Sequence, residues 1–277
     1  MPLFILISGY FTRKKDGAKS FLKSLLPIIV PLIIFQFINI LALCVFCRRA
    51  LDFSFLLTPY WTLWYLLSLI FWRVIIQYTP SWLLEKPLLR ILTATILSLL
   101  CGLMPNGRIL SLRRTITFYP FFLFGYYMGK GIVKSKFWNN TISYSIIMIV
   151  ALLILFDLYP SNTSILLKGA DQYSISDIPA KIYLFACSTT MSLSVFNVVK
   201  EQKLLSAIGK NSLFYYLYHA LLISYFISVL IHHFSFPNTF IFLIFYCIFI
   251  LGVIYVFSRI NIFRWLVYPT SKQKNKM

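Results

Sequence analysis

Long apolar segments, separated by short polar ones, make up most of this chain. After an apolar stretch at residues 1–11, eight long segments contain few charges, at 24–47, 61–78, 88–104, 116–133, 142–159, 179–199, 211–231 and 238–257. A helix of about 20 residues is long enough to cross the hydrocarbon core of a bilayer, which is about 30 Å thick. The pattern therefore predicts an all-α, polytopic integral membrane helix bundle with eight full spans and an N-terminal half span.

These segments lack the alternation that indicates strands. Strands of a membrane barrel alternate apolar and polar residues over about ten positions, whereas these segments are longer and uniformly apolar. Helices also satisfy their own backbone hydrogen bonds within lipid. Because 60% of the residues are hydrophobic and only 12% are charged, the composition excludes an ordinary soluble protein. With short loops, no linker and no internal repeat, residues 1–277 are expected to form a single membrane domain.

The net charge of +19 predicts an orientation. Most of the 26 lysines and arginines fall in alternate loops and in the tail, near residues 13–23, 86–90, 130–136, 200–210 and 259–276. Fewer fall on the opposite side, and Lys181 is one of these. Cytoplasmic loops of membrane proteins carry such an excess. We therefore expect a multi-pass protein of the cell membrane with a cytoplasmic C-terminus, whose basic surface lies against membrane lipid. No soluble domain remains for nucleic acid, so we expect no nucleic-acid partner.

A few polar residues within the apolar segments are candidates for chemistry. Ser212, Tyr215 and His219 are spaced by three and four residues, so they share one face of a helix. An ionisable side chain at this depth usually faces a cavity or a partner, which makes His219 the best candidate for a base. The alternative is a neutral histidine that is hydrogen-bonded between helices. The five cysteines lie in or beside apolar segments and indicate no metal site.

Arginines form a second group of candidates. Arg73 lies inside an apolar segment, and it either contacts a phosphate or carbonyl group within a cavity or extends to the membrane surface. Arg108, Arg113 and Arg114 are expected on the outer side. There they would hold an acidic polysaccharide or a lipid-linked sugar phosphate, reach the acyl carrier from a loop that dips inward, or meet lipid headgroups. Trp64 either stacks on a sugar ring or belongs to the interfacial aromatic belt.

Four stretches together resemble one known family. In the order and spacing of the acyltransferase 3 family, notably its fucose 4-O-acetylase-like branch, the chain contains MPLFILISGYF followed by a lysine-rich loop, PYWTLWYLLSLIFWR, RRTITFYPFFLFGYYMGK and IGKNSLFYYLYH. The resemblance covers residue 1 to about residue 230. It implies a bacterial membrane enzyme that O-acylates sugars of surface polysaccharides.

The resemblance also implies substrates and site residues. The acyl donor would be acetyl-CoA, and the acceptor would be a hydroxyl of an extracytoplasmic glycan, either on the cell surface or linked to lipid. Ser8, Gly9 and Tyr10 match the family's SGY turn, and Gly9 would permit close backbone approach, either at the substrate site or between packed helices. The catalytic candidates are His219, Ser8 and Tyr215. The candidates for binding the donor or the acceptor are Arg73, Arg108, Arg113, Arg114, Trp64 and Tyr10.

The opening stretch raises the question of completeness. In the family, the SGY stretch ends the second span, and an earlier span carries a histidine that is taken to be the catalytic base. We therefore expect this chain to lack the first span, through a truncated gene or a misassigned start codon. Two other hypotheses stay open at this point: a transporter or flippase for glycan precursors, and an inactive relic of the family.

Overall fold

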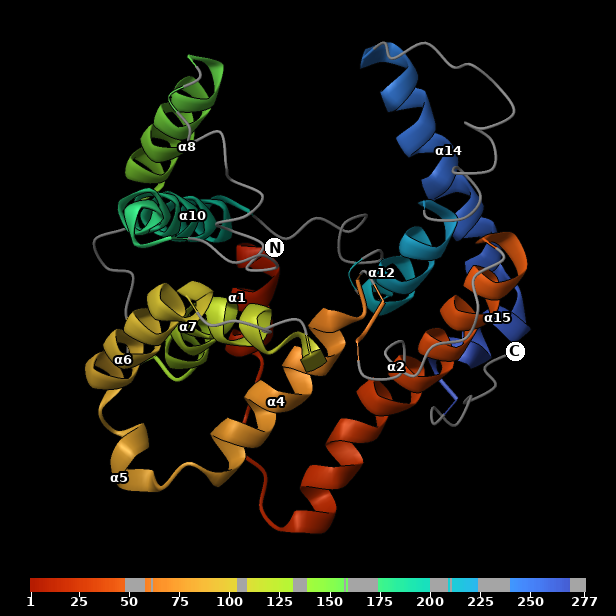
Figure 1. The fold of residues 1–277 in the computed structure, drawn as a ribbon, viewed down its shortest axis with the longest axis horizontal. Helices are drawn as coiled ribbons and strands as arrows, with labels where there is room; N and C mark the ends of the chain where they lie inside the picture. Colours follow the sequence, from red (N-terminus) through yellow and green to blue (C-terminus); the bar gives the residue numbers. More distant parts are fainter. Residues whose placement is uncertain are drawn as a thin grey trace. The chain divides into compact units, whose positions relative to one another are not determined.

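The computed structural model of the protein describes residues 1–47, 58–60, 62–103, 109–131, 139–156, 158, 174–199, 209, 211–223 and 240–269. Within these residues every regular element is a helix, as the apolar pattern predicts (Figure 1). The chain divides into two compact units. Unit 1 comprises Met1–Phe21 and Ser68–Lys200, and unit 2 comprises Leu22–Leu67 and Glu201–Met277.

Unit 1 is a stack of helices. It contains α1 (Pro2–Tyr10), the second part of α4 (Trp64–Tyr78), α5 (Ser81–Leu84), α6 (Pro87–Leu100), α7 (Leu112–Gly129), α8 (Asn140–Leu155) and α10 (Ile178–Val198), with 3-10 turns at Cys101–Leu103, Ile109–Ser111 and Ile175–Asp177. Helix α1 packs against α7 and α10, and α6 packs against the other side of α7. Helix α10 in turn separates α8 from α1 (Figure 1).

Local signals in the sequence explain where several of these helices begin. Proline occupies the first turn of α1, α6 and α10, where its missing N–H removes no helical hydrogen bond. At the start of α8, the Asn139 side chain accepts a hydrogen bond from the Ile142 N–H at 2.9 Å. Ser174 and Asp177 form a reciprocal capping box just before α10. These caps position the helices that carry the site described below.

Unit 2 is organised around one aromatic side chain. It contains α2 (Ala18–Cys47) from Leu22 onward, the first turn of α4, α12 (Ser212–Leu221), α14 (Phe240–Arg259) and α15 (Asn261–Val267). The Tyr218 ring of α12 lies 5.2 Å from the Phe35 ring of α2 and 5.8 Å from the Phe257 ring of α14. Its hydroxyl donates to the Phe263 carbonyl of α15 at 3.2 Å. Tyr218 thus joins α2, α12, α14 and α15.

The described helices match the predicted segments more closely in position than in length. Each of the eight predicted segments contains a helix. Among the described residues, one helix is long and apolar enough to cross a membrane, at Ala18–Val45, and the bent pair of α14 and α15 adds a second when it is counted as one span. Three shorter apolar helices lie at Trp64–Tyr78, Pro87–Leu103 and Asn140–Leu155. The number of spans therefore stays a prediction from the sequence.

Candidate functional site

A glycine-lined crossing of α1 and α7 holds the SGY turn. Methyl groups built on Gly9 and Gly125 would lie 2.0 Å from the Phe122 carbonyl oxygen and 1.9 Å from the Leu6 carbonyl oxygen. A methyl group on Gly129 would lie 2.2 Å from the Tyr10 carbonyl oxygen. Small residues permit this approach of two backbones, as in other membrane helix pairs. The glycine of the SGY turn therefore serves helix packing.

Ser8 and Tyr10 flank that glycine on α1. The Ser8 hydroxyl donates to the Phe4 carbonyl of its own helix at 2.9 Å, a common bond for serine in a helix. Tyr10 is half-buried, and its ring lies 5.3 Å from the ring of Phe196 on α10. Both candidates of the SGY turn thus lie where α1 meets its neighbours in unit 1.

Arg73 and the arginines of α7 also belong to unit 1. Arg73 is half-buried on α4, beside the fully buried Trp72, whose indole N–H donates to the Thr115 carbonyl at 2.9 Å. Arg113 is 5% exposed in the first turn of α7, and Arg114 is half-buried next to it. The structure places Arg113 inside the protein, although the sequence left lipid headgroups as one of its possible partners. Arg108 lies outside the described residues.

Next to Arg113 lies a buried lysine that the sequence interpretation counted only as an outer-side cation. Lys181 of α10 is 2% exposed, and its ammonium group donates to the Ser98 carbonyl in the last turn of α6. A cation at the end of a helix is favoured by the helix dipole. The Cys101 thiol donates to the same carbonyl at 3.2 Å. Lys181 therefore ties α10 to the C-terminal end of α6.

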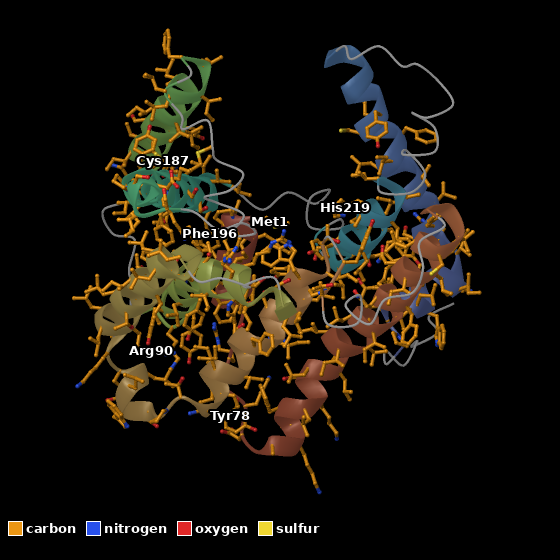
Figure 2. All side chains as sticks on the ribbon, viewed as in Figure 1. Met1, Tyr78, Arg90, Cys187, Phe196 and His219 are labelled. Atoms are coloured by element: carbon orange, nitrogen blue, oxygen red, sulfur yellow. The ribbon has the colours of Figure 1, made fainter. Side chains whose placement is uncertain are left out.

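A second buried cation, Arg90, lies at the opposite end of α6 (Figure 2). Arg90 is 7% exposed, and its guanidinium donates to the hydroxyls of Tyr127 at 3.1 Å and Tyr119 at 2.9 Å. A longer contact of 3.4 Å reaches the Thr79 hydroxyl at the end of α4. The sequence interpretation assigned Arg90 to a cytoplasmic loop on its charge alone. We name Arg90, Tyr119, Tyr127 and Thr79 the Arg90 cluster.

The loop after α1 joins the same end of unit 1. Lys14 donates to the Thr79 carbonyl at 3.1 Å, and Arg13 donates to the Gly129 carbonyl at 3.0 Å. Lys130 places its ammonium group over the ring of Tyr126, 4.9 Å from the centroid. The loop after α1, the end of α4, the start of α6 and the end of α7 therefore meet at one end of unit 1, and this end is rich in cations.

The remaining candidates belong to unit 2. Tyr215 and His219 are both half-buried on α12, while Phe214, Leu217 and Tyr218 on the same helix face the core (Figure 2). The His219 Nδ1 lies 2.9 Å from the Tyr215 carbonyl oxygen. A carbonyl only accepts hydrogen bonds, so a neutral His219 carries its proton on Nδ1 and keeps the lone pair on Nε2. Such a ring can act as a base.

Trp64 begins α4 and is also part of unit 2. It is 6% exposed, and its ring meets the Tyr65 ring edge to face at 6.3 Å. The described candidates thus separate by unit. Unit 1 holds Ser8, Tyr10, Arg73, Arg113 and Arg114, and unit 2 holds Trp64, Tyr215 and His219. In unit 1, α1, α4 and α7 carry the candidates, and α4 contacts α7 through the hydrogen bond from Trp72 to Thr115.

In the described part of the chain, no group of three or more histidine, cysteine, aspartate or glutamate side chains is arranged to hold a metal ion. The groups available for chemistry are an imidazole, several guanidinium and ammonium groups, and hydroxyls. Such groups can remove a proton from a hydroxyl and hold anionic or carbonyl oxygens.

Comparison with known proteins identifies the family. The family model described as an acyltransferase domain, that of the acyltransferase 3 family, matches residues 1–259, which is most of the chain. Comparison with curated proteins and with solved structures gives no match. The matched range confirms the resemblance seen in the four sequence stretches. The chain belongs to the acyltransferase 3 family of membrane acyltransferases.

Proposed function

We propose that this protein is a membrane O-acetyltransferase that moves an acetyl group from acetyl-CoA to a hydroxyl of a cell-surface or lipid-linked glycan. The observation that carries the proposal is the family match over residues 1–259. The family match does not identify the donor or the acceptor, so both are proposals. They are supported by the basic end of unit 1, which suits an anionic donor, and by the imidazole of α12.

The reaction needs a base at the sugar hydroxyl. With a proton on Nδ1 held by the Tyr215 carbonyl, the Nε2 lone pair of His219 accepts the hydroxyl proton. The sugar oxygen then bonds to the acetyl carbonyl carbon, the carbon–sulfur bond breaks, and the proton passes from His219 to the departing thiolate. A positioned base of this kind contributes about 100-fold to 10,000-fold to a rate. His219 is the base of the proposed reaction.

The other candidates hold the two substrates in this proposal. Arg73 contacts the phosphate or carbonyl oxygens of the donor. Arg114 holds an acidic glycan, and the half-buried ring of Tyr10 stacks on a sugar ring. Each of these roles is tested by its own single variant.

The test is transfer of radiolabelled acetyl groups from acetyl-CoA to membrane glycan in membranes that contain the full chain. His219→Ala is expected to reduce the initial rate by about 100-fold or more, because the base is lost. Ser212→Ala is the matched control, since Ser212 lies on the same face of α12 and is exposed. Its rate should stay within about twofold of the unsubstituted chain, as expected for an exposed serine whose hydroxyl takes no part in the proposed reaction.

Two outcomes contradict this proposal. Undiminished transfer by the His219→Ala protein would remove His219 from the site. A full chain that transfers no acetyl group to any membrane glycan, while it is folded and inserted, would overturn the choice of donor and acceptor. In that case another acyl thioester, or another hydroxyl-bearing acceptor, would be the substrate of this family member.

A further inference from the structure

The Arg90 cluster contains a buried positive charge whose partners are all neutral. Arg90 is 7% exposed, and its guanidinium donates to the Tyr119, Tyr127 and Thr79 hydroxyls. No carboxylate in the described part of the chain reaches Arg90. Buried charges in proteins are generally paired, because removing a charge from water is costly. The described residues of the cluster therefore supply a buried cation and no anion to pair with it.

The position of Arg90 on its helix strengthens this argument. Arg90 is the fourth residue of α6, so its charge lies near the positive end of the helix dipole. Lys86 caps the same end of α6, and Lys14 bonds to the carbonyl of Thr79. An anion at this place would be favoured by the helix end and by the buried charge of Arg90.

The cluster also has hydrogen-bond donors to spare. A guanidinium has five N–H donors, and three hydrogen bonds from Arg90 are found among the described residues. Tyr119 and Tyr127 accept from Arg90, so each keeps its own O–H proton for another acceptor. The Tyr126 hydroxyl is completely buried, has no hydrogen-bond partner among the described residues, and lies within electrostatic range of Tyr119. A ligand with several acceptor oxygens would satisfy these donors.

A phosphate group is the ligand that fits this set of donors. Its oxygens are strong acceptors, and arginine binds them with two parallel hydrogen bonds. We propose that Arg90, Tyr119 and Tyr127 bind a phosphate group of an anionic ligand at the cation-rich end of unit 1. The phosphate belongs either to the acyl donor, a source that rests on the proposed function, or to a lipid headgroup. Both sources present the same chemistry to the cluster.

The first experiment measures binding without turnover. The full chain is purified in dodecyl maltoside, a detergent without phosphate, and the dissociation constant of coenzyme A is measured by titration calorimetry. Arg90→Gln is expected to weaken binding at least tenfold. Arg259→Gln is the matched control, because the Arg259 guanidinium also bonds to a tyrosine hydroxyl, that of Tyr255 at 2.5 Å, but is exposed and lies in unit 2. This control should bind as tightly as the unsubstituted chain.

A second titration in the same detergent uses short-chain phosphatidylglycerol, and its outcomes separate the two sources. Weaker binding of coenzyme A alone assigns the site to the acyl donor. Weaker binding of phosphatidylglycerol alone assigns it to lipid headgroups. If Arg90→Gln binds both probes as tightly as the unsubstituted chain does, the proposal is overturned.

A third variant guards against misfolding of the Arg90→Gln protein. In the Tyr119→Phe/Tyr127→Phe double variant, Arg90 keeps its charge and the aromatic packing is preserved. Loss of the two hydroxyls should weaken binding of the same probe several-fold, and unchanged binding would contradict the proposed role of the tyrosines. A chain that binds coenzyme A through Arg90 but transfers no acetyl group would overturn the proposed function and leave the phosphate site in place.

Discussion

At the scale of single residues, two glycines show how closely α1 and α7 are packed. The atoms nearest to a methyl group on Gly9 or Gly125 are carbonyl oxygens of the opposite helix, at 2.0 Å and 1.9 Å. Backbone atoms cannot move out of the way unless the helix moves with them. The sequence predicted close approach at Gly9 without deciding between a substrate and a neighbouring helix. The structure decides for the helix.

Gly125→Ala is therefore expected to lower the free energy of unfolding by about 1–3 kcal/mol, the usual cost of overpacking. Gly252→Ala is the matched control, because a methyl group on Gly252 of α14 meets nothing within 4 Å. Alanine is the better helix former, so this control should unfold at the same temperature or slightly higher. Thermal unfolding of the purified chains in detergent measures both. Equal melting temperatures of the two variants would show that the crossing tolerates a methyl group.

The burial of two cations, Arg90 and Lys181, could not be predicted from the sequence. The sequence interpretation counted Arg90 and Lys181 by charge as loop residues on opposite sides of the membrane, whereas the structure buries both within helices. A cation near a helix end faces water or protein according to the side chains opposite it. For Arg90 these are Tyr119 and Tyr127, which lie 29 and 37 residues further along the chain. Such partners depend on how the helices pack, and a single sequence does not reveal that packing.

At the scale of helices, the apolar pattern was sufficient for most elements because lipid leaves the backbone no other structure. The predicted segment at 88–104 corresponds to α6 and the turn Cys101–Leu103, and the segment at 179–199 corresponds to α10. The short helices α5 and α15 were not predicted, because four and seven residues are too few to show a period. The bend between α14 and α15 is equally invisible in composition.

That bend carries a prediction of its own. Helix α15 turns by 94° from the apolar helix before it, so it runs across the direction of α14. Val267 of α15 faces the core, whereas Ile262, Arg264 and Trp265 are exposed. Exposed tryptophan and arginine beside an aliphatic side chain are typical of a helix in the plane of the membrane interface. We expect α15 to lie there.

Quenching by brominated lipids measures this placement. In nanodiscs whose acyl chains carry bromine near the headgroup, Trp265 should be strongly quenched. Trp265→Phe should therefore remove a quenched component of the fluorescence. Trp72→Phe is the control, since the fully buried Trp72 should contribute an unquenched component. If both variants lose the same quenched fraction, α15 is not at the interface.

At the scale of the whole molecule, charge and contacts in unit 1 support one sidedness. The hydrogen bonds from Lys14 to Thr79 and from Arg13 to Gly129 bring together loops that the positive-inside rule assigns to the same side of the membrane. The rule depends only on the distribution of charge along the sequence, whereas the hydrogen bonds are observed in the structure. Their agreement favours a cytoplasmic position for this end of unit 1. The multi-pass topology itself stays a prediction.

The sidedness of the C-terminus is the prediction on which donor and acceptor placement depend. The end of α14 and the tail after it contain Arg259, Arg264 and three lysines beyond residue 270, so the positive-inside rule places them in the cytoplasm. A green fluorescent protein fused after Met277 should therefore fluoresce, and alkaline phosphatase fused at the same position should be inactive, because the phosphatase needs an oxidising compartment for its disulfides. The reverse pattern would move the cation-rich end of unit 1 away from cytoplasmic acetyl-CoA. Binding of coenzyme A by Arg90 would then lose its physiological source, and a lipid phosphate would remain as the ligand of that cluster.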